Sequence, residues 1–599
     1  MTAHVLVFAI GPVQGFISTA RRGRDLWFSS WLLSELARAA AEAAREHLVM
    51  PTQDLVDDER AAISNKITLY LVDADPAGVA LAMEAALRQR LDGLTSELLA
   101  RPELRGLVDA VRARQQVLDL PEIAWASASV LLDRWYPRAR ALAERLLAAR
   151  KSSKHFGQPP WGDSVHKSSL DGQRESVLNI DQHRGERRPE DIQQLFRIGV
   201  GPKERLCGVG LLKRLGHRIQ PDAGGRVLST SHVASWSTRR RFHEPGSFQD
   251  ACRECFERFE AILRRHHADL SRTPRRDPVL GHTDGHILYE SRLRDLFPGG
   301  EVPEEVTTAL RRLYREWSAA AAEHGQEPIK PPTPYYAVLV ADGDKMGAAL
   351  NALEDPGKHR EVTQILARFA ARAEEIVEAH HGHCVYAGGD DVLALLPVTT
   401  VLRCAGQLND AFADVGQAFE DHGAPKTTMS AGVHIAHHLH PLQDALAGGR
   451  AAEQHAKQVL ERDAFAVQVD KRSGVPVRAG GKWRAFEQFE ELLGAFQGSQ
   501  SLPRGLPYVL RGIADRLPDP EAPDRSSSAQ EGRDPPPLDL GPIRAAEVAR
   551  ILSQKDLTPD QLWIPQIEGE IDPALDLRAL ADRLLVARTL SGMEADRGR

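Results

Sequence analysis

Two short acidic motifs hold the side chains best suited to chemistry. Asp-Gly-Asp occupies residues 342–344, and Gly-Gly-Asp-Asp occupies residues 388–391. Carboxylates are ligands that Mg2+ and Mn2+ prefer, and two such ions can activate a ribose 3′-hydroxyl and neutralise a leaving pyrophosphate. Together the motifs predict a two-metal site for nucleotidyl transfer.

The spacing within each motif suits this purpose. Asp342 and Asp344 come where an apolar stretch ends, and alternation along a strand would point both carboxylates to one ion. Gly343 between them would let its backbone carbonyl approach the metal. Gly388 and Gly389 suit the positive φ angles of a tight hairpin turn. The motifs are therefore expected at a strand end and at a hairpin.

Asp390 and Asp391 are expected at the tip of that hairpin, as catalytic residues and metal ligands, although a solvated turn could carry the same sequence. In a β-α-β-β-α-β order the first strand lies beside the hairpin, so the motifs would converge. Lys457, on a later helix, could reach a triphosphate as a point charge, or could simply be solvated.

The surrounding pattern supplies this order of elements. Apolar positions between residues 362 and 377 recur at the helical period and predict one helix with a single apolar face. The expected strands span residues 335–341, 383–387, 392–398 and 429–436.

The predicted fold class is α+β, with two ferredoxin-like palm domains separated by an irregular, partly helical domain and followed by a helical domain. In the first palm we expect a long helix over residues 16–43. Composition predicts a flexible loop at residues 518–542. The expected domains are residues 1–150, 151–330, 331–480 and 481–599.

Two other pairs could be mistaken for metal ligands. Asp73 and Asp75 repeat the Asp-x-Asp spacing, but Asp75 precedes Pro76, which favours a helix N-cap. Cys252 and Cys255 lie in an amphipathic stretch without a second pair nearby. Since a closed zinc site needs four ligands, we interpret them as core or surface thiols.

Bulk properties restrict the class of protein. The net charge is −7 and the isoelectric point is near 6.4, which argues against a protein that coats nucleic acid by itself. No stretch has the roughly 20 apolar residues of a membrane span. Five cysteines make no disulfide framework in 599 residues. We expect a cytoplasmic protein with reduced thiols.

Several longer segments resemble the large signature subunit of type III-B CRISPR effector complexes. They lie in the same order as in that family and cover most of residues 4–460. These segments are IGPVQGFISTARRGRDLWFSSWLLSEL, ERLCGVGLLKRL, PYYAVLVADGDKMG, YAGGDD and SAGVHIAHHLHPL.

The resemblance implies two facing palms that hold two ATP molecules and make cyclic oligoadenylates with 3′–5′ links. Synthesis would begin when the complex, with its other subunits and guide RNA, pairs with target RNA. Asp342 and Asp390 would be the leading metal ligands, with the Gly343 carbonyl, Asp344 and Asp391 in support. The first palm would bind nucleotide without supplying metal.

Two departures from the family pattern are visible. Many relatives begin with a histidine-aspartate nuclease domain, whereas this sequence starts at the first palm strand, so no DNase activity is predicted. Relatives often hold zinc with two Cys-x-x-Cys pairs, where this chain has Ser168, Asp171, Cys207 and Gly210. Because three of the four thiols are missing, zinc is not expected.

Other patterns leave alternatives open. Histidines at 380–383 and 434–440 are interpreted as core or solvated rather than ligands, and arginines at 239–241 and 264–276 are candidates for phosphate contacts with RNA. The chain could instead be a catalytically silent scaffold, or could join AMP to another metabolite. A GGDEF-type cyclase would have Glu in place of Asp391.

Overall fold

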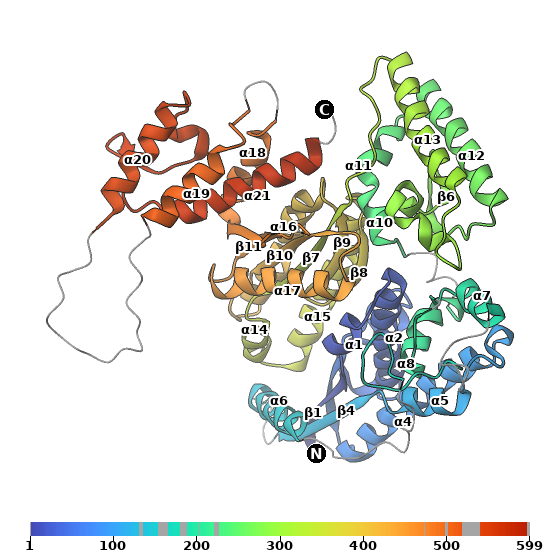
Figure 1. Ribbon diagram of the computed structural model, residues 1–599. Coiled ribbons are helices and arrows are strands. Elements are labelled where there is room, and N and C mark those ends of the chain that lie inside the picture. The colour runs from blue at the N-terminus through green and yellow to red at the C-terminus, as the bar shows by residue number, and fades with distance from the viewer. Residues whose placement is uncertain are drawn as a thin grey trace.

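Figure 1 shows the computed structural model, which is α+β as predicted. Residues 518–538 of the predicted loop lie outside the part described, and residue 541 already begins a helix. No helix among the described residues is long and apolar enough to cross a membrane. The structure describes residues 2–130, 136–153, 166–179, 189–201, 203–220, 227–472, 474–497, 501–517 and 539–595.

The first sheet is built around one strand that is buried on both faces. Strand β1 has Leu6 and Phe8 in one apolar cluster, and Val5 and Val7 in another beneath α6. The strand order β2-β3-β1-β4, with antiparallel neighbours, is the ferredoxin-like order. The strands are β1 (Ala3–Gly11), β2 (Leu48–Met50), β3 (Lys66–Val72) and β4 (Glu122–Val130).

The long helix predicted over residues 16–43 is wrong, because the chain forms two helices there. Asp25 accepts hydrogen bonds from the backbone N–H groups of Arg21 and Arg22, which starts a new helix at Gly23. The predicted Asp75 cap is confirmed by bonds from the next helix's N–H groups. The helices are α1 (Gln14–Ser18), α2 (Gly23–Glu42), α3 (Gln53–Asp57), α4 (Pro76–Leu99), α5 (Ala110–Leu118) and α6 (Tyr136–Ser152).

The middle of the chain is built from short elements and one pair of longer helices, α12 and α13. These two pack against each other over their own apolar cluster (Figure 1). Cys252 and Cys255 are buried in that cluster, which confirms that they are core thiols. The elements are α7 (Pro189–Arg197), α8 (Gly208–Leu215), α10 (Thr230–Ala234), α11 (Trp236–Arg239), α12 (Ser247–Arg265), β5 (Arg272–Asp277), β6 (Gly281–Thr283) and α13 (Glu304–Glu323).

The second sheet has the order β12-β11-β10-β7-β9-β8. Its last four members are the predicted strands in ferredoxin-like order, whereas β11, which runs parallel to β10, and β12 were not predicted. The strands are β7 (Tyr335–Gly343), β8 (His383–Gly388), β9 (Asp391–Pro397), β10 (Met429–His437), β11 (Ala464–Val469) and β12 (Val477–Lys482). The helices are α14 (Met346–Ala352), α15 (Pro356–Ala379), α16 (Val401–Asp421) and α17 (Leu442–Gln458).

The two faces of the second sheet have different neighbours. Helices α15 and α16 share an apolar cluster with one face. Tyr336, Val338 and Val385 on the other face belong to the cluster that contains Leu6 and Phe8 of the first sheet. One continuous core therefore joins the two palms.

The C-terminal helices lie beside β11 and β12, at the far edge of the sheet from β8 (Figure 1). Helix α21 packs along α19 and α18 and reaches β12. The elements are α18 (Phe486–Gly494), α19 (Leu506–Arg516), α20 (Gly541–Ser553), β13 (Gln566–Ile567), β14 (Glu570–Ile571) and α21 (Leu577–Ala595).

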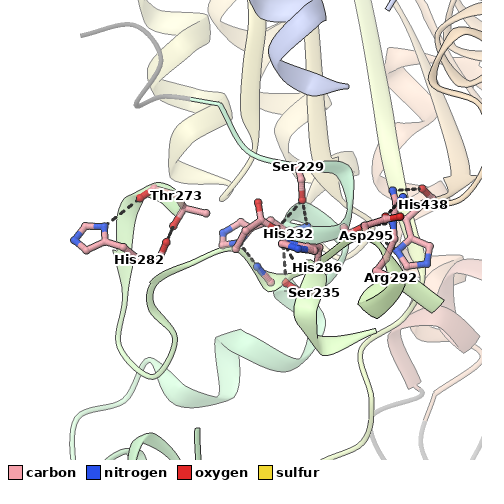
Figure 2. Close-up of polar contacts among 12 residues, drawn as sticks. Ser229, His232, Ser235, Thr273, His282, His286, Arg292, Asp295 and His438 are labelled. Carbon is pink, nitrogen blue, oxygen red and sulfur yellow. Dashed lines mark hydrogen bonds and ion pairs between the residues drawn. The ribbon is translucent and has the colours of Figure 1, made fainter. Parts of the chain in front are cut away.

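A polar junction connects the middle region to the second palm through His438, which follows β10 (Figure 2). The Nδ1 atom of His438 lies 3.0 Å from Oγ of Ser231, and Arg292 donates to the His438 carbonyl over 3.0 Å. Burial and the Arg292 charge lower the pKa of His438 to about 3, so its ring stays neutral.

Candidate active site

Three of the predicted carboxylates meet at one end of the second sheet. Oxygens of Asp342, Asp390 and Asp391 lie within 4.8 Å of one another. Strands β7 and β9 are antiparallel with Ala341 opposite Val392, which brings the end of β7 beside the start of β9. Within the described part of the chain, no other group of three or more Asp, Glu, His or Cys has this spacing. We call these three residues the acidic cluster.

Steric contacts explain the predicted glycines. A Cβ atom on Gly343 would lie 2.8 Å from Oδ2 of Asp390, so a side chain there would displace this carboxylate. Gly389 has a φ of +68°, which non-glycine residues rarely adopt. A Cβ on Gly388 would lie 2.2 Å from the Tyr386 hydroxyl oxygen. Glycine at these positions lets the hairpin hold its two aspartates against β7.

The structure does not bring Asp344 into the acidic cluster. Its carboxylate accepts hydrogen bonds from Thr428 Oγ1 over 2.7 Å, from Ser430 Oγ over 2.8 Å and from the Asp463 N–H over 2.9 Å. Strand β7 ends at Gly343, so the alternation that would point Asp344 alongside Asp342 stops one residue too early. Asp344 instead fixes the turn to its neighbouring strands.

The acidic cluster has more negative charge than its surroundings favour. Burial raises the pKa of Asp390 to about 7, and the nearby Asp391 charge adds to this effect. Burial on its inner side raises the pKa of Asp391 to about 6, although part of this residue is exposed. Hard oxygen ligands with an open side and unfavourable mutual repulsion fit one or more divalent cations.

Lys457 of α17 reaches the cluster. Its ammonium group forms ion pairs with Asp342 and, over 2.8 Å, with Glu453 one turn earlier. These pairs favour the charged form, whereas burial and the Arg462 charge oppose it and lower the Lys457 pKa to about 8. The sequence prediction had no role for Glu453, although its position four residues before a lysine was a usable signal.

A glycine lets α17 come this close. A Cβ on Gly432 of β10 would lie 2.1 Å from the backbone nitrogen of Glu453. The helix backbone therefore rests directly on the strand. This contact sets how far Glu453 and Lys457 extend toward the end of the sheet.

The first palm contributes a positive charge rather than carboxylates. Lys66, at the start of β3, lies close enough for its charge to lower the pKa of Asp390, and it pairs with Glu144 over 2.9 Å. The central strand of the second palm ends in Asp342-Gly343, whereas that of the first palm ends in Ile10-Gly11 and carries no acidic residue there. The acidic cluster thus faces the junction between the palms.

Several of the other sequence candidates have structural partners. His434 pairs with the Ala445 carbonyl over 2.8 Å, and His381 stacks on Trp236. Arg239 forms a buried ion pair with Asp277 over 2.8 Å. The arginines 264 and 265 pair with the glutamates 260 and 305.

The positions expected to replace a zinc site do come together. Cys207 donates to Asp171 over 3.5 Å, and the Arg174 guanidinium lies 3.4 Å from the same carboxylate. Burial raises the pKa of Cys207 to about 11, and its sulfur accepts a bond from the Gly210 N–H over 3.3 Å. A hydrogen-bonded group of thiol, carboxylate and guanidinium therefore stands here.

Two segments match known families. Residues 335–466 match the second palm domain of Cas10/Cmr2, and residues 5–96 match the N-terminal part of the CRISPR-associated protein Cmr2. The CRISPR system Cmr subunit Cmr2 of Pyrococcus furiosus is 33% identical over 201 residues. That match covers 29% of this chain and spans about a fifth, 21%, of the relative's length.

Solved structures match the fold over almost the whole chain. The type III-B Cmr-beta structure in the apo state aligns with a TM-score of 0.63 and 15% identity, covering 99% of this chain and 82% of the other. The Cmr-beta structure bound to cognate target RNA aligns with a TM-score of 0.60, also at 15% identity, covering 99% and 83%. The arrangement of palms and helices is therefore shared with these structures.

Proposed function

We propose that this chain, as a relative of the Cas10/Cmr2 subunits, is the nucleotidyl-transferring subunit of a type III-B CRISPR effector complex. It would make cyclic oligoadenylates from ATP when the complex has paired its guide RNA with target RNA. The observation that carries this proposal is the meeting of Asp342, Asp390 and Asp391 beside Lys457 at the junction of the palms.

The acidic cluster would hold the divalent cations, Mg2+ or Mn2+. Bound there, such ions supply a lowered pKa for a ribose 3′-hydroxyl and a counter-charge for pyrophosphate. Asp342 and Asp390 provide ligands from β7 and from the hairpin, and Asp391 provides one from the exposed side. Asp344 keeps the β7 turn in place.

The reaction forms a bond from the 3′-oxygen of one nucleotide to the α-phosphorus of the next and breaks the bond from that phosphorus to the β-phosphate. Pyrophosphate leaves, and the 3′-hydroxyl proton passes to solvent water. Lys457 exchanges its contact with Asp342 for the triphosphate, since either anionic group can pair with its ammonium. Glu453 orients Lys457 through their ion pair. Lys66 of the first palm adds a positive charge that acts on Asp390.

The proposed protein and RNA partners rest on the same similarity to Cmr proteins. The relatives are a Cmr subunit and Cmr-beta complexes, one of them bound to cognate target RNA. We propose that this chain likewise works with other subunits, a guide RNA and a target RNA. Control of synthesis by RNA would then act on the palm junction that the acidic cluster faces.

The test uses the assembled complex with ATP, Mg2+ and matched or mismatched target RNA, and mass spectrometry identifies the products. We expect oligoadenylates only with matched RNA, and a rate about 10³-fold lower for Asp390→Asn, because several kcal/mol of charge stabilisation are lost. Asp414→Asn, an exposed carboxylate of the same palm, is the matched control.

Two outcomes would reject the proposal. If the wild-type complex makes no nucleotide product with matched RNA, the chain is a scaffold. If Asp390→Asn keeps the wild-type rate, the acidic cluster is not the catalytic centre. Product masses also distinguish cyclic oligoadenylates from AMP joined to another metabolite.

A further inference from the structure

Two arginines at the start of α2 lack the partners that the other buried arginines have. Arg22 and Arg24 are both partly buried. Among the residues that the structure describes, neither guanidinium donates a hydrogen bond or lies within ion-pair distance of a carboxylate. By contrast, Arg239 of the basic runs singled out from sequence is paired within the fold. Arg22 and Arg24 lie outside both basic runs.

Both guanidiniums lie against the same glycine. A Cβ atom on Gly199 would be 3.3 Å from Nη1 of Arg24 and 3.4 Å from Nη1 of Arg22. Gly199 has a φ of +81°, so this position favours glycine for its backbone as well as for space. The two donors converge over bare backbone, where a small ligand meets no side chain from this residue.

Neighbouring carboxylates are already used. Arg214 is fully buried and binds Asp25 over 2.7 Å and Glu204 over 2.7 Å with both ends of its guanidinium. Arg22, Arg24 and Arg214 thus lie near two carboxylates, and both carboxylates pair with Arg214. Burial and the Arg214 charge lower the pKa of Arg22 to about 10. A negative charge is missing from this group, and the positive end of the 20-residue helix α2 points the same way.

We propose that Arg22 and Arg24, over Gly199, bind the phosphate of a nucleotide unit at a site separate from the acidic cluster. A phosphate oxygen pair matches the planar donors of two guanidiniums, and its charge balances theirs. The site shares no residue with the acidic cluster and goes beyond the proposed function.

The same face of α2 favours a nucleotide over other oxyanions. Trp27 and Trp31 follow Arg24 by three and seven residues, so the three side chains share one side of the helix. Both indoles are partly exposed, and their rings stack with centroids 6.4 Å apart. The exposed part of an aromatic ring beside a phosphate site provides a surface on which a base can stack.

The phosphate could belong to an RNA strand or to a free nucleotide, and the experiment separates the two. The purified full-length chain is titrated with a short fluorescent single-stranded RNA and, separately, with ATP. EDTA is present throughout, so that the acidic cluster contributes no metal-dependent binding. The variants are Arg22→Gln, Arg24→Gln and their combination. The control is Arg88→Gln, a surface arginine paired with Glu84 over 2.8 Å.

For the ligand that uses this site, we expect the double variant to bind about 10- to 100-fold more weakly, since two charge-assisted hydrogen bonds are lost. If that ligand is RNA, the slope of log affinity against log salt should fall by about one for each arginine. Arg88→Gln should bind like the wild type.

Stability distinguishes a binding role from a structural one. Because removing an unpaired, partly buried charge relieves repulsion, each variant should melt at the wild-type temperature or higher without ligand, while the ligand no longer raises the melting temperature. Unchanged affinity for both probes would overturn the proposal, as would variants that melt earlier and lose binding only in proportion to unfolding.

Discussion

Each palm carries an Asp-x-Asp segment where a strand ends, but the two segments act differently. In the first palm Asp73 accepts a bond from the Thr2 N–H over 2.9 Å, and Asp75 caps α4. In the second, Asp342 joins the acidic cluster and Asp344 fixes a turn. The neighbouring elements decide the role of each segment: a helix start in the first palm, and in the second a facing hairpin with two further carboxylates.

The largest effect in this comparison is expected for Asp344→Ala. It would leave the buried Ser430 hydroxyl without its acceptor, together with the partly buried Thr428 hydroxyl and Asp463 N–H. We expect the unfolding free energy of the second palm to fall by about 3 kcal/mol. Denaturant titration measures it, and Asp344→Asn, which keeps one oxygen acceptor, should lose less. Unchanged stability with lost nucleotide turnover would instead make Asp344 a metal ligand.

A smaller effect is expected at a contact between the palms. His359 of α15 has Nδ1 2.8 Å from the Tyr136 hydroxyl of α6 and Nε2 2.8 Å from the Leu350 carbonyl, so the neutral ring accepts at one nitrogen and donates at the other. Burial lowers the pKa of His359 to about 4. Its ordinary value is near 6.5, so the folded state resists protonation more than the unfolded state does.

This contact stabilises the protein fully above pH 6.5 and loses its contribution as the pH falls toward 4. Between pH 7 and pH 5 the loss from His359 is about 2 kcal/mol. Comparing thermal melts of wild type and His359→Gln at both pH values isolates the part of the acid-induced loss of stability that comes from His359. Equal acid sensitivity of the two proteins would show that other groups are responsible.

The smallest effect is expected for Asp75→Ala, which removes the cap of α4 but no buried contact. Loss of a helix N-cap costs about 1 kcal/mol. Nucleotide turnover should be unchanged, because Asp75 is a helix cap, not a member of the acidic cluster. A loss of turnover without a loss of stability would mean that the first palm's acidic pair does more than cap a helix.

The sequence was sufficient for elements with a strong local signal. Strands β7 and β9 of the second palm contain continuous apolar runs, and the hairpin glycines mark the turn before β9. Strand β12 escaped notice because it contains Gly480 and Gly481, which weaken a strand signal. Strand β11 directly follows three residues with positive φ, at 461–463, that no local rule predicted.

The sequence was sufficient to predict the two acidic motifs of the candidate site, but not the position of Asp344 or the pairing of the arginines. Alternation misplaced Asp344 because the strand ends at Gly343 and Lys345 takes a left-handed φ of 56°. For Arg239, one of the sequence candidates, the partner Asp277 lies 38 residues along the chain, so no local pattern showed this ion pair. Conversely, Arg22 and Arg24 stand out only once the carboxylates near them are seen to be occupied.

The continuous core between the palms limits how this chain can be divided. A fragment that begins near residue 331 would expose the face of the second sheet that carries Tyr336, Val338, Val385 and Leu395. The complementary fragment would expose its counterpart around Leu6 and Phe8. Soluble halves should therefore be obtained by producing them together, since each half covers the apolar surface of the other.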